Sequence, residues 1–308
     1  MKVNKKLVDE GLKQSDLIPQ TVCGVCGETL EEFGDFDRDL DIRFSRCPGC
    51  GVVTYNKVAT QEYLDHMYSN YNDAYDWYNP GENESVTFAQ PDRIARHIFK
   101  YIKKHLADKT EFKIMDFGGG SGVMGYKLAK VLILNGICDK VTVTVVDYLD
   151  ALYRTDDPAV YMERVFPVHD VETIDYDVII ASAIIEHLPK PSDEMKALFD
   201  RMAVDGFLYC RMPYAYPMFT LAKKIGVDFD MLYPGHIWDF PPEWFENVIK
   251  FVSDPDHVSL VVSQPSIPET TLNSHFIRAL VTRMFKAPWY VFHKWPFVGG
   301  WEAIYRRI

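Results

Sequence analysis

Two short cysteine pairs constrain the first part of this chain more than any other feature. Cys23 and Cys26 form one C-x-x-C pair, and Cys47 and Cys50 form the other, with residues 27–46 between them. Each pair makes a tight turn that presents two thiolates to one ion. Four thiolates suit tetrahedral Zn²⁺ and leave no position for water, so we predict a structural zinc site in a small zinc-ribbon-like module. A redox dithiol is the alternative, but two matched pairs favour metal.

The composition of the 308 residues sets wider limits. A hydrophobic content of 47% is enough for one large domain and a smaller one. The net charge of −11 disfavours nucleic acid as the main partner, and residues 20–60, with seven acids against four bases, disfavour a nucleic-acid-binding ribbon. No uncharged apolar stretch of membrane-spanning length occurs, and the first ten residues lack an apolar signal core. We therefore expect a cytoplasmic protein without a transmembrane segment.

Positive charge is concentrated near the C-terminus. Residues 270–308 carry six basic residues and one acid, a balance of +5. Because the net charge of the whole chain is −11, the other residues together carry a charge of −16. Within this region, residues 276–286 alternate with helical period between an apolar face and a basic face that includes Arg278 and Arg283. A diphosphate and an anionic membrane surface are both candidate partners for this basic helix, and a solvated surface is the alternative.

The pattern along the chain predicts three parts. Residues 1–60 hold the cysteine pairs, and residues 61–91 form a Tyr-rich connector with the proline-glycine turn Pro80-Gly81. From residue 92 to 308, apolar helical periods alternate with short β-branched strands, which predicts an α/β fold with a parallel sheet. Strands are expected at about 113–116, 141–146, 177–181, 207–211, 258–263 and 301–305. Helices are expected at 92–106 and 125–134, and after Ser192 as N-cap.

A glycine-rich loop joins the first strand of this region to the next helix. Asp116 is followed by Phe117 and then by the loop glycines Gly118, Gly119, Gly120 and Gly122. Glycines let the backbone approach a ligand closely, and ligands of open α/β sheets bind at the carboxyl ends of the strands. The next strand ends at Asp147, an acid placed to accept hydrogen bonds from ribose hydroxyls; a helix cap or a solvated loop acid is the alternative.

These residues resemble the first motif of class I S-adenosylmethionine-dependent methyltransferases. In the resemblance, Asp147 matches the ribose-binding acid, and Asp170 and Val171 match the pair that flanks the adenine. Residues 181–191, which contain Glu-His-Leu-Pro, and residues 235–240 resemble later landmarks of the family. The resemblance implies a Rossmann-like, seven-stranded, mostly parallel sheet with helices on both faces. Together with the cysteine module, it is similar to methyltransferases of sugar and glycan biosynthesis, which implies a nucleotide sugar or another small acceptor.

Methyl transfer to a hydroxyl or carbon acid requires removal of a proton, and three residues are candidates for that chemistry. His187 is the first candidate base and His236 the second, while Glu186 would orient the cofactor or the histidine. A structural histidine that bonds the next loop is the alternative for His187. Ser182 and Ala183 stand where some relatives carry an acid that binds metal, so no catalytic metal is expected. Two other functions stay open: an RNA or protein methyltransferase, and a non-catalytic cofactor-binding protein. In the connector, Tyr71, Tyr75 and Tyr78 are candidates to line the acceptor side.

Overall fold

A computed structural model of the chain describes residues 12–69, 90–106, 109–148, 152–155, 157–165, 175–227, 231, 233–252, 257–267 and 276–308. Most of the predicted Tyr-rich connector, including Tyr71, Tyr75 and Tyr78, lies outside the described residues. Asp170 and Val171, predicted to flank an adenine, also lie outside them.

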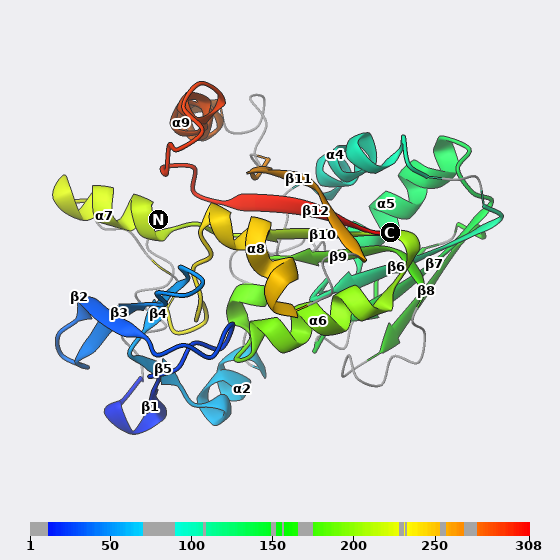
Figure 1. The fold of residues 1–308 in the computed structure, drawn as a ribbon. Coiled ribbons are helices and arrows are strands. Elements are labelled where there is room, and N and C mark those ends of the chain that lie inside the picture. The colour runs from blue at the N-terminus through cyan, green and yellow to red at the C-terminus, as the bar shows by residue number, and fades with distance from the viewer. Residues whose placement is uncertain are drawn as a thin grey trace.

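A seven-stranded sheet forms the centre of the molecule (Figure 1). Its strand order is β11-β12-β10-β9-β6-β7-β8, and every neighbouring pair is parallel except those that include β12. The mostly parallel seven-stranded sheet expected from the sequence is therefore confirmed. Its strands are β6 (Glu111–Phe117), β7 (Lys140–Val146), β8 (Val160–Val165), β9 (Tyr176–Ser182), β10 (Met202–Met212), β11 (Val258–Pro265) and β12 (Trp301–Arg307).

One strand of the sheet, β8, was not predicted from the sequence. The edge strand β8 has the sequence Val-Tyr-Met-Glu-Arg-Val, and only Val160 is buried in it. Central strands such as β9 are buried at every position and therefore appear as continuous apolar runs. An edge strand that is mostly half-exposed carries polar residues, which hides it from a search for apolar runs.

Helices cover both faces of the sheet, as expected (Figure 1). Consecutive residues of a strand point to opposite faces, so Ile114 and Met115 of β6 belong to different core clusters. The cluster around Ile114 includes buried residues of α4 (Pro91–Ile102) and α5 (Val123–Leu134). The cluster around Met115 includes residues of α6 (Pro191–Arg201) and α8 (Pro242–Val252).

Ser192 does not cap α6, contrary to the expectation from sequence. The N-cap is Lys190, and Pro191 is the first residue of the helix, a position at which proline costs no hydrogen bond. The hydroxyl of Ser192 donates instead to the carbonyl of Gly24, at 2.9 Å. The side chain thus connects the large sheet domain to the cysteine-bearing segment.

The cysteine-bearing segment folds as a three-stranded antiparallel sheet, β2-β3-β4, beside a two-stranded sheet of β1 and β5. An aromatic cluster that includes Phe36, Phe44 and Tyr55 packs the sheet against Tyr233 and the helix α7. The elements of this part are η1 (Gln14–Asp16), β1 (Leu17–Pro19), β2 (Glu31–Asp37), β3 (Ile42–Arg46), β4 (Val53–Tyr55), β5 (Lys57–Ala59), α2 (Gln61–Ser69) and α7 (Tyr216–Lys224).

The helix α9 (Phe276–Lys286) stands away from the sheet, followed by the short helix η4 (Ala287–Tyr290) (Figure 1). The apolar face expected from its sequence is exposed rather than buried: Ile277 is 76% accessible and Met284 65%. The C-terminal end of α9 is held by Lys286, whose ammonium donates to the backbone carbonyl and to the hydroxyl of Ser266. Among the described helices, none has the length and hydropathy needed to cross a bilayer.

Candidate functional site

The four paired cysteines converge at one point of the N-terminal part. The sulfur of Cys23 lies 3.6 Å from that of Cys50, and the sulfur of Cys26 lies 3.3 Å from that of Cys47. All four sulfurs lie within 4.8 Å of one another. Sulfurs held at about 2.3 Å around a tetrahedral zinc ion would be about 3.8 Å apart, so the donor set and its spacing fit the ion.

The cysteine cluster packs directly against the segments that follow β9 and precede α8. The edge of the Trp238 ring lies against Gly24, so closely that a methyl group at Gly24 would come within 2.8 Å of the ring. The Trp238 indole donates to the carbonyl of Leu188, at 2.9 Å. Cys23, Cys47 and Trp238 share one core cluster. The cysteine module therefore supports the walls of the sheet's carboxyl edge.

Hydrogen bonds also connect the cysteine module to the segment before α8. Val53 of β4 pairs with Asp239 in an isolated antiparallel bridge. The hydroxyl of Thr54 donates to the carbonyl of Ile237 at 2.8 Å, and the backbone amide of Ile237 donates to the carbonyl of Glu186 at 2.9 Å. A continuous set of hydrogen bonds thus leads from the cysteine module to Glu186.

The glycine loop leaves β6 in a conformation that only glycine adopts without strain. Gly118 and Gly122 have φ angles of +67° and +84°. A side-chain carbon at Gly118 would come within 2.5 Å of Ile184, and one at Gly122 within 2.3 Å of Val145. The loop therefore lies tightly between the end of β7 and the segment after β9.

The structure brings Asp147, the predicted ribose-binding acid, to this loop. The backbone amide of Gly120 donates to the Asp147 carboxylate at 2.8 Å. Arg164, which sequence reasoning missed, donates to the backbone carbonyls of Asp147 and Tyr148. No sequence motif predicts the role of Arg164, because that role depends on the pairing of β8 with β7. Asp147 and the loop thus form one polar cradle at the carboxyl edge of the sheet.

Asp116 lies beneath the loop rather than on its surface. Its side chain is buried and accepts a hydrogen bond from the backbone amide of Gly125 at 2.8 Å. A side-chain carbon at Gly119 would come within 2.3 Å of the Asp116 carboxyl carbon. Burial raises the pKa of Asp116 to about 7, and the nearby Asp147 adds to the rise. Asp116 therefore holds the loop and the start of α5 in place.

The three predicted catalytic candidates also lie together. Glu186 and His187 belong to the short helix η3 (Ile185–His187), and His236 comes from the loop before α8. The rings of His187 and His236 meet edge to face with centroids 4.6 Å apart. The Nδ1 atom of His187 lies 2.9 Å from the carbonyl oxygen of Gly235, so it carries the proton and donates. His187 thus makes the loop contact expected of a structural histidine.

Burial makes both histidines poor bases. It lowers the pKa of His187 to about 4 and brings that of His236 well below its usual range, where the neighbouring His187 adds to the effect. Burial also raises the pKa of Glu186 to about 8. A neutral imidazole with so low a pKa removes a proton weakly at neutral pH, so the geometry gives little support to His187 as a general base.

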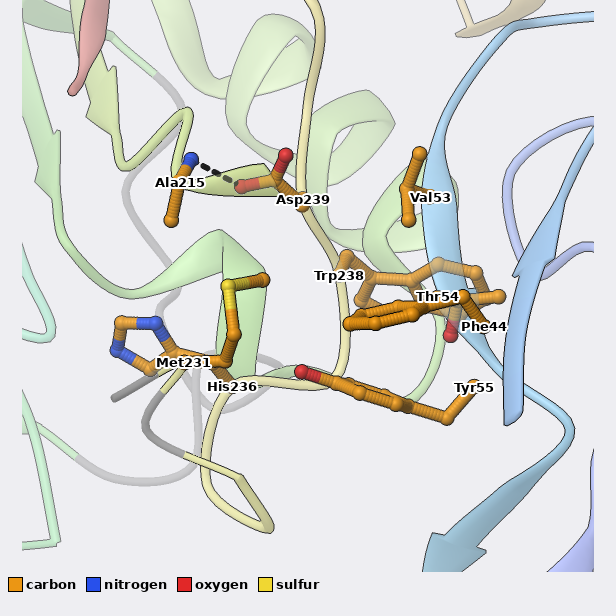
Figure 2. Close-up of a pocket in the computed structure, with 9 residues that line it drawn as sticks. All are labelled: Phe44, Val53, Thr54, Tyr55, Ala215, Met231, His236, Trp238 and Asp239. Atoms are coloured by element: carbon orange, nitrogen blue, oxygen red, sulfur yellow. Dashed lines mark hydrogen bonds between the residues drawn. The ribbon is translucent and has the colours of Figure 1, made fainter. Parts of the chain in front are cut away.

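A small pocket lies between the cysteine module and this cluster (Figure 2). Figure 2 shows Val53, Thr54 and Tyr55 on one side of it, with Ala215 and His236 on the other. Asp239 accepts hydrogen bonds from the backbone amides of Ala215 and Tyr216, at 2.6 and 3.2 Å. The pocket places His236 at the boundary between the two parts of the molecule.

Comparison with known proteins extends this description. Residues 89–250 match the model of a family described as methyltransferase domain. The chain is similar to a malonyl-[acyl-carrier protein] O-methyltransferase of Bacillus cereus, with 23% identity over 121 residues. That match covers 38% of this chain and 43% of the relative, so the chain spans less than half of the relative's length.

Two solved structures are also similar to the chain. The plantazolicin methyltransferase BpumL, in complex with a monoazolic desmethylPZN analog and SAH, matches with a TM-score of 0.49 and 15% identity, over 80% of this chain and 91% of that chain. The [4+2]-cyclase SpnF matches with a TM-score of 0.48 and 12% identity, over 81% of this chain and 96% of that chain.

Proposed function

The chain belongs to the family of methyltransferase domains, and we propose that it transfers the methyl group of S-adenosylmethionine to a small-molecule acceptor. The observation that carries the proposal is the hydrogen bond between Gly120 of the glycine loop and the Asp147 carboxylate. It joins an acid suited to ribose hydroxyls with a loop whose backbone approaches a ligand closely, at the edge of the sheet where ligands of such folds bind.

In this proposal, the loop glycines Gly118, Gly119, Gly120 and Gly122 bound the cofactor and Asp147 accepts from its ribose. Asp116 acts from below, by fixing the loop through Gly125. Asp170 and Val171 stay predicted adenine neighbours. The bound cofactor supplies an electrophilic methyl group on a sulfonium, and the protein aligns the acceptor in line with it.

The four cysteines are proposed to hold a structural zinc ion. The support is the converging sulfur set, in which Cys23 and Cys47 are almost completely buried. Four protein ligands leave no open position, so the ion would stabilise the module and take no part in the transfer. Its effect on activity would come through the contacts of Gly24 and Thr54 with the sheet edge.

A nucleotide sugar or a related glycan precursor is the proposed acceptor class, and two arginines support an anionic substrate. Arg93, in the first turn of α4, has its pKa lowered by burial and by the charge of Arg283 on α9. The Nη1 atom of Arg283 is buried and makes no hydrogen bond to the described residues. Two neighbouring cations in a partly buried place repel each other and therefore favour binding of an anion between them. A diphosphate group is such an anion.

Arg283→Gln tests this substrate class. We expect at least a tenfold rise in the KM for a nucleotide sugar with little change in the affinity for S-adenosylhomocysteine, because the arginine binds only the acceptor. Arg38→Gln is the control, since Arg38 is exposed and remote from both arginines in sequence and fold. An unchanged KM in Arg283→Gln would remove the diphosphate proposal.

A carboxyl acceptor is the second candidate, because the similar protein of Bacillus cereus is named as an O-methyltransferase of malonyl-[acyl-carrier protein]. Incubation of labelled cofactor with nucleotide sugars, acyl-carrier thioesters, RNA and peptides separates the candidates. Label in nucleotide sugars supports the first, and label only in RNA or peptides overturns it. Failure of S-adenosylhomocysteine to bind in calorimetry would overturn the methyltransferase proposal itself.

Peripheral contact of α9 with an anionic membrane is a separate proposal about the partner. It is supported by the exposed residues Ile277 and Met284 and by the positive balance of residues 270–308. Co-sedimentation with phosphatidylserine vesicles, compared with neutral vesicles, tests it. The double variant Ile277→Ser/Met284→Ser is expected to abolish the sedimentation, and equal binding to both vesicle types would contradict the proposal. The cytoplasmic location stays a prediction.

A further inference from the structure

The carboxylate of Glu186 lies in an environment that a carboxylate rarely tolerates. The residue is completely buried, and neither carboxylate oxygen has a hydrogen-bond partner among the described residues. Buried polar groups are normally paired, and an unpaired one costs stability that is usually retained only for a function. Glu302, which is also well buried, accepts hydrogen bonds from His97, Tyr209 and Gln264, which shows how such a group is otherwise satisfied.

Two imidazoles lie beside this carboxylate. The Nε2 atom of His187 is 4.0 Å from Oε1 of Glu186, too far for a hydrogen bond. One donor atom from each of Glu186, His187 and His236 lies within 4.8 Å of the others. Because Nδ1 of His187 donates to the Gly235 carbonyl, its Nε2 atom carries the lone pair. A backbone carbonyl that fixes the ring through its other nitrogen is the usual support of a metal-binding histidine.

We propose that Glu186, His187 and His236 bind a divalent transition-metal ion, separate from the ion of the four cysteines. Two nitrogens and one carboxylate oxygen are a common donor set for such ions, and three protein ligands leave coordination positions open. Donors bound at about 2.1 Å to one ion lie about 3.0–3.4 Å apart, so binding draws the three side chains together by around one ångström. The local sequence pattern does not predict this metal, since the third ligand comes from a loop 49 residues after His187 rather than from Ser182 or Ala183.

The proposal of this ion rests on the proposed methyl transfer, and it adds a role for the ion in that reaction. Ile184, two residues before Glu186, packs against Gly118 of the glycine loop, so the ion would lie beside the cofactor. An ion with open positions binds an oxygen of the acceptor, lowers the pKa of a hydroxyl group and orients it toward the methyl group. The acceptor class is therefore one with a metal-binding oxygen, such as a diol or an α-hydroxy acid.

Titration of the zinc-loaded protein with Co²⁺ tests the site without any measurement of activity. Zinc holds thiolate sites more strongly than cobalt, so Co²⁺ reports on the second site alone. We expect one Co²⁺ per chain in calorimetry and a visible spectrum without thiolate-to-cobalt charge transfer. Glu186→Gln and His236→Gln should each weaken Co²⁺ binding by at least about 100-fold. Loss of a residue that only supports a metal ligand can already lower metal affinity by about 100-fold, so loss of a ligand itself should lower it at least as much.

Two controls keep the result interpretable. His97→Gln changes a histidine that is also paired with a glutamate, Glu302, but that forms no three-ligand group with the described His, Cys, Asp and Glu residues, so Co²⁺ binding should be unchanged. A zinc content of one per chain and a single cooperative thermal transition show that each variant is folded. Absence of Co²⁺ binding in the wild-type protein, or equal binding in Glu186→Gln, overturns the proposal. S-adenosylhomocysteine binding is measured in the same samples, so failure of the methyltransferase proposal is seen separately.

Discussion

The cysteine module and the carboxyl edge of the sheet both gather potential metal ligands, but they do so in different ways. The module takes two ligands from each of two tight turns, and its four sulfurs all come from residues 23–50. At the sheet edge, the glycine loop, Asp147, Glu186 and His236 arrive from four separate places in the chain. The module is built by local spacing, whereas the edge exists only after the sheet has formed.

The two regions also differ in how their polar groups are satisfied. The cysteine sulfurs have one another and the backbone amides of Val25 and Cys50 as partners. The carboxyl oxygens of Glu186 are buried and have no hydrogen-bond partner in the part of the chain that the structure describes. We infer that the module serves stability and that the edge sacrifices stability for chemistry. Removal of a clustered thiol should therefore destabilise the protein, whereas removal of the Glu186 carboxyl should stabilise it.

The largest effect is expected from Cys47→Ala. Loss of one thiolate removes the zinc site, and metal binding is folding free energy in small modules of this kind. We expect a loss of at least about 3 kcal/mol, seen as a fall of roughly 10 °C in the thermal midpoint. Zinc content per chain and thermal denaturation measure it.

Cys138→Ala is the matched control for this prediction. Cys138 is also buried, at 6% accessibility, but lies outside the cluster of four sulfurs. The same chemical change there should cost about 1 kcal/mol or less and leave the zinc content at one. Equal midpoints for the two variants would remove the structural role of the module.

Gly122→Ala is expected to have the next largest effect. The left-handed backbone costs about 1–2 kcal/mol for a non-glycine residue, and the added methyl group clashes with Val145. We expect a loss of about 2–4 kcal/mol in stability and at least a tenfold loss in affinity for S-adenosylhomocysteine, measured by calorimetry. Gly136→Ala has nearly the same φ angle but open space around it, so it should keep the affinity. Loss of affinity in both variants would mean that the loop is not the binding site.

Glu186→Met should stabilise the protein, in contrast to the two substitutions above. In protein that holds only the cysteine-bound zinc, removal of an unpaired buried carboxyl should raise the free energy of unfolding by about 1–3 kcal/mol. Glu302→Met is the control and should lower it by a similar amount, since it leaves His97 and Gln264 without their shared acceptor. Urea denaturation of both variants measures the difference. Destabilisation by both would show that Glu186 is an ordinary structural residue.

The same contrast explains what the sequence could predict. The cysteine site follows from spacing within 28 residues, and the strands β6, β7 and β9 follow from continuous apolar runs. The alignment of His236 with Glu186 required the bonds of Ile237 and Trp238 to the Glu186 carbonyl, which no local pattern encodes. The exposure of the apolar face of α9 could not be predicted, because periodicity shows that a helix is amphipathic but not what covers it.

The smallest effect is expected where the two regions meet, at Thr54. Its hydroxyl accepts from Gln20 and donates to Ile237, which in turn bonds to Glu186. Thr54→Val keeps the shape but leaves the Ile237 carbonyl unpaired, at a cost of about 1–2 kcal/mol. Because the lost bond positions the loop that carries His236, Co²⁺ affinity and methyl transfer should also fall several-fold. The control Ser45→Ala removes a buried hydroxyl of the same module that has no partner among the described residues, so it should not lower stability and should leave Co²⁺ affinity and methyl transfer within about twofold of the wild type. If Thr54→Val lowers stability but leaves Co²⁺ affinity unchanged, the module stabilises the protein without positioning the site.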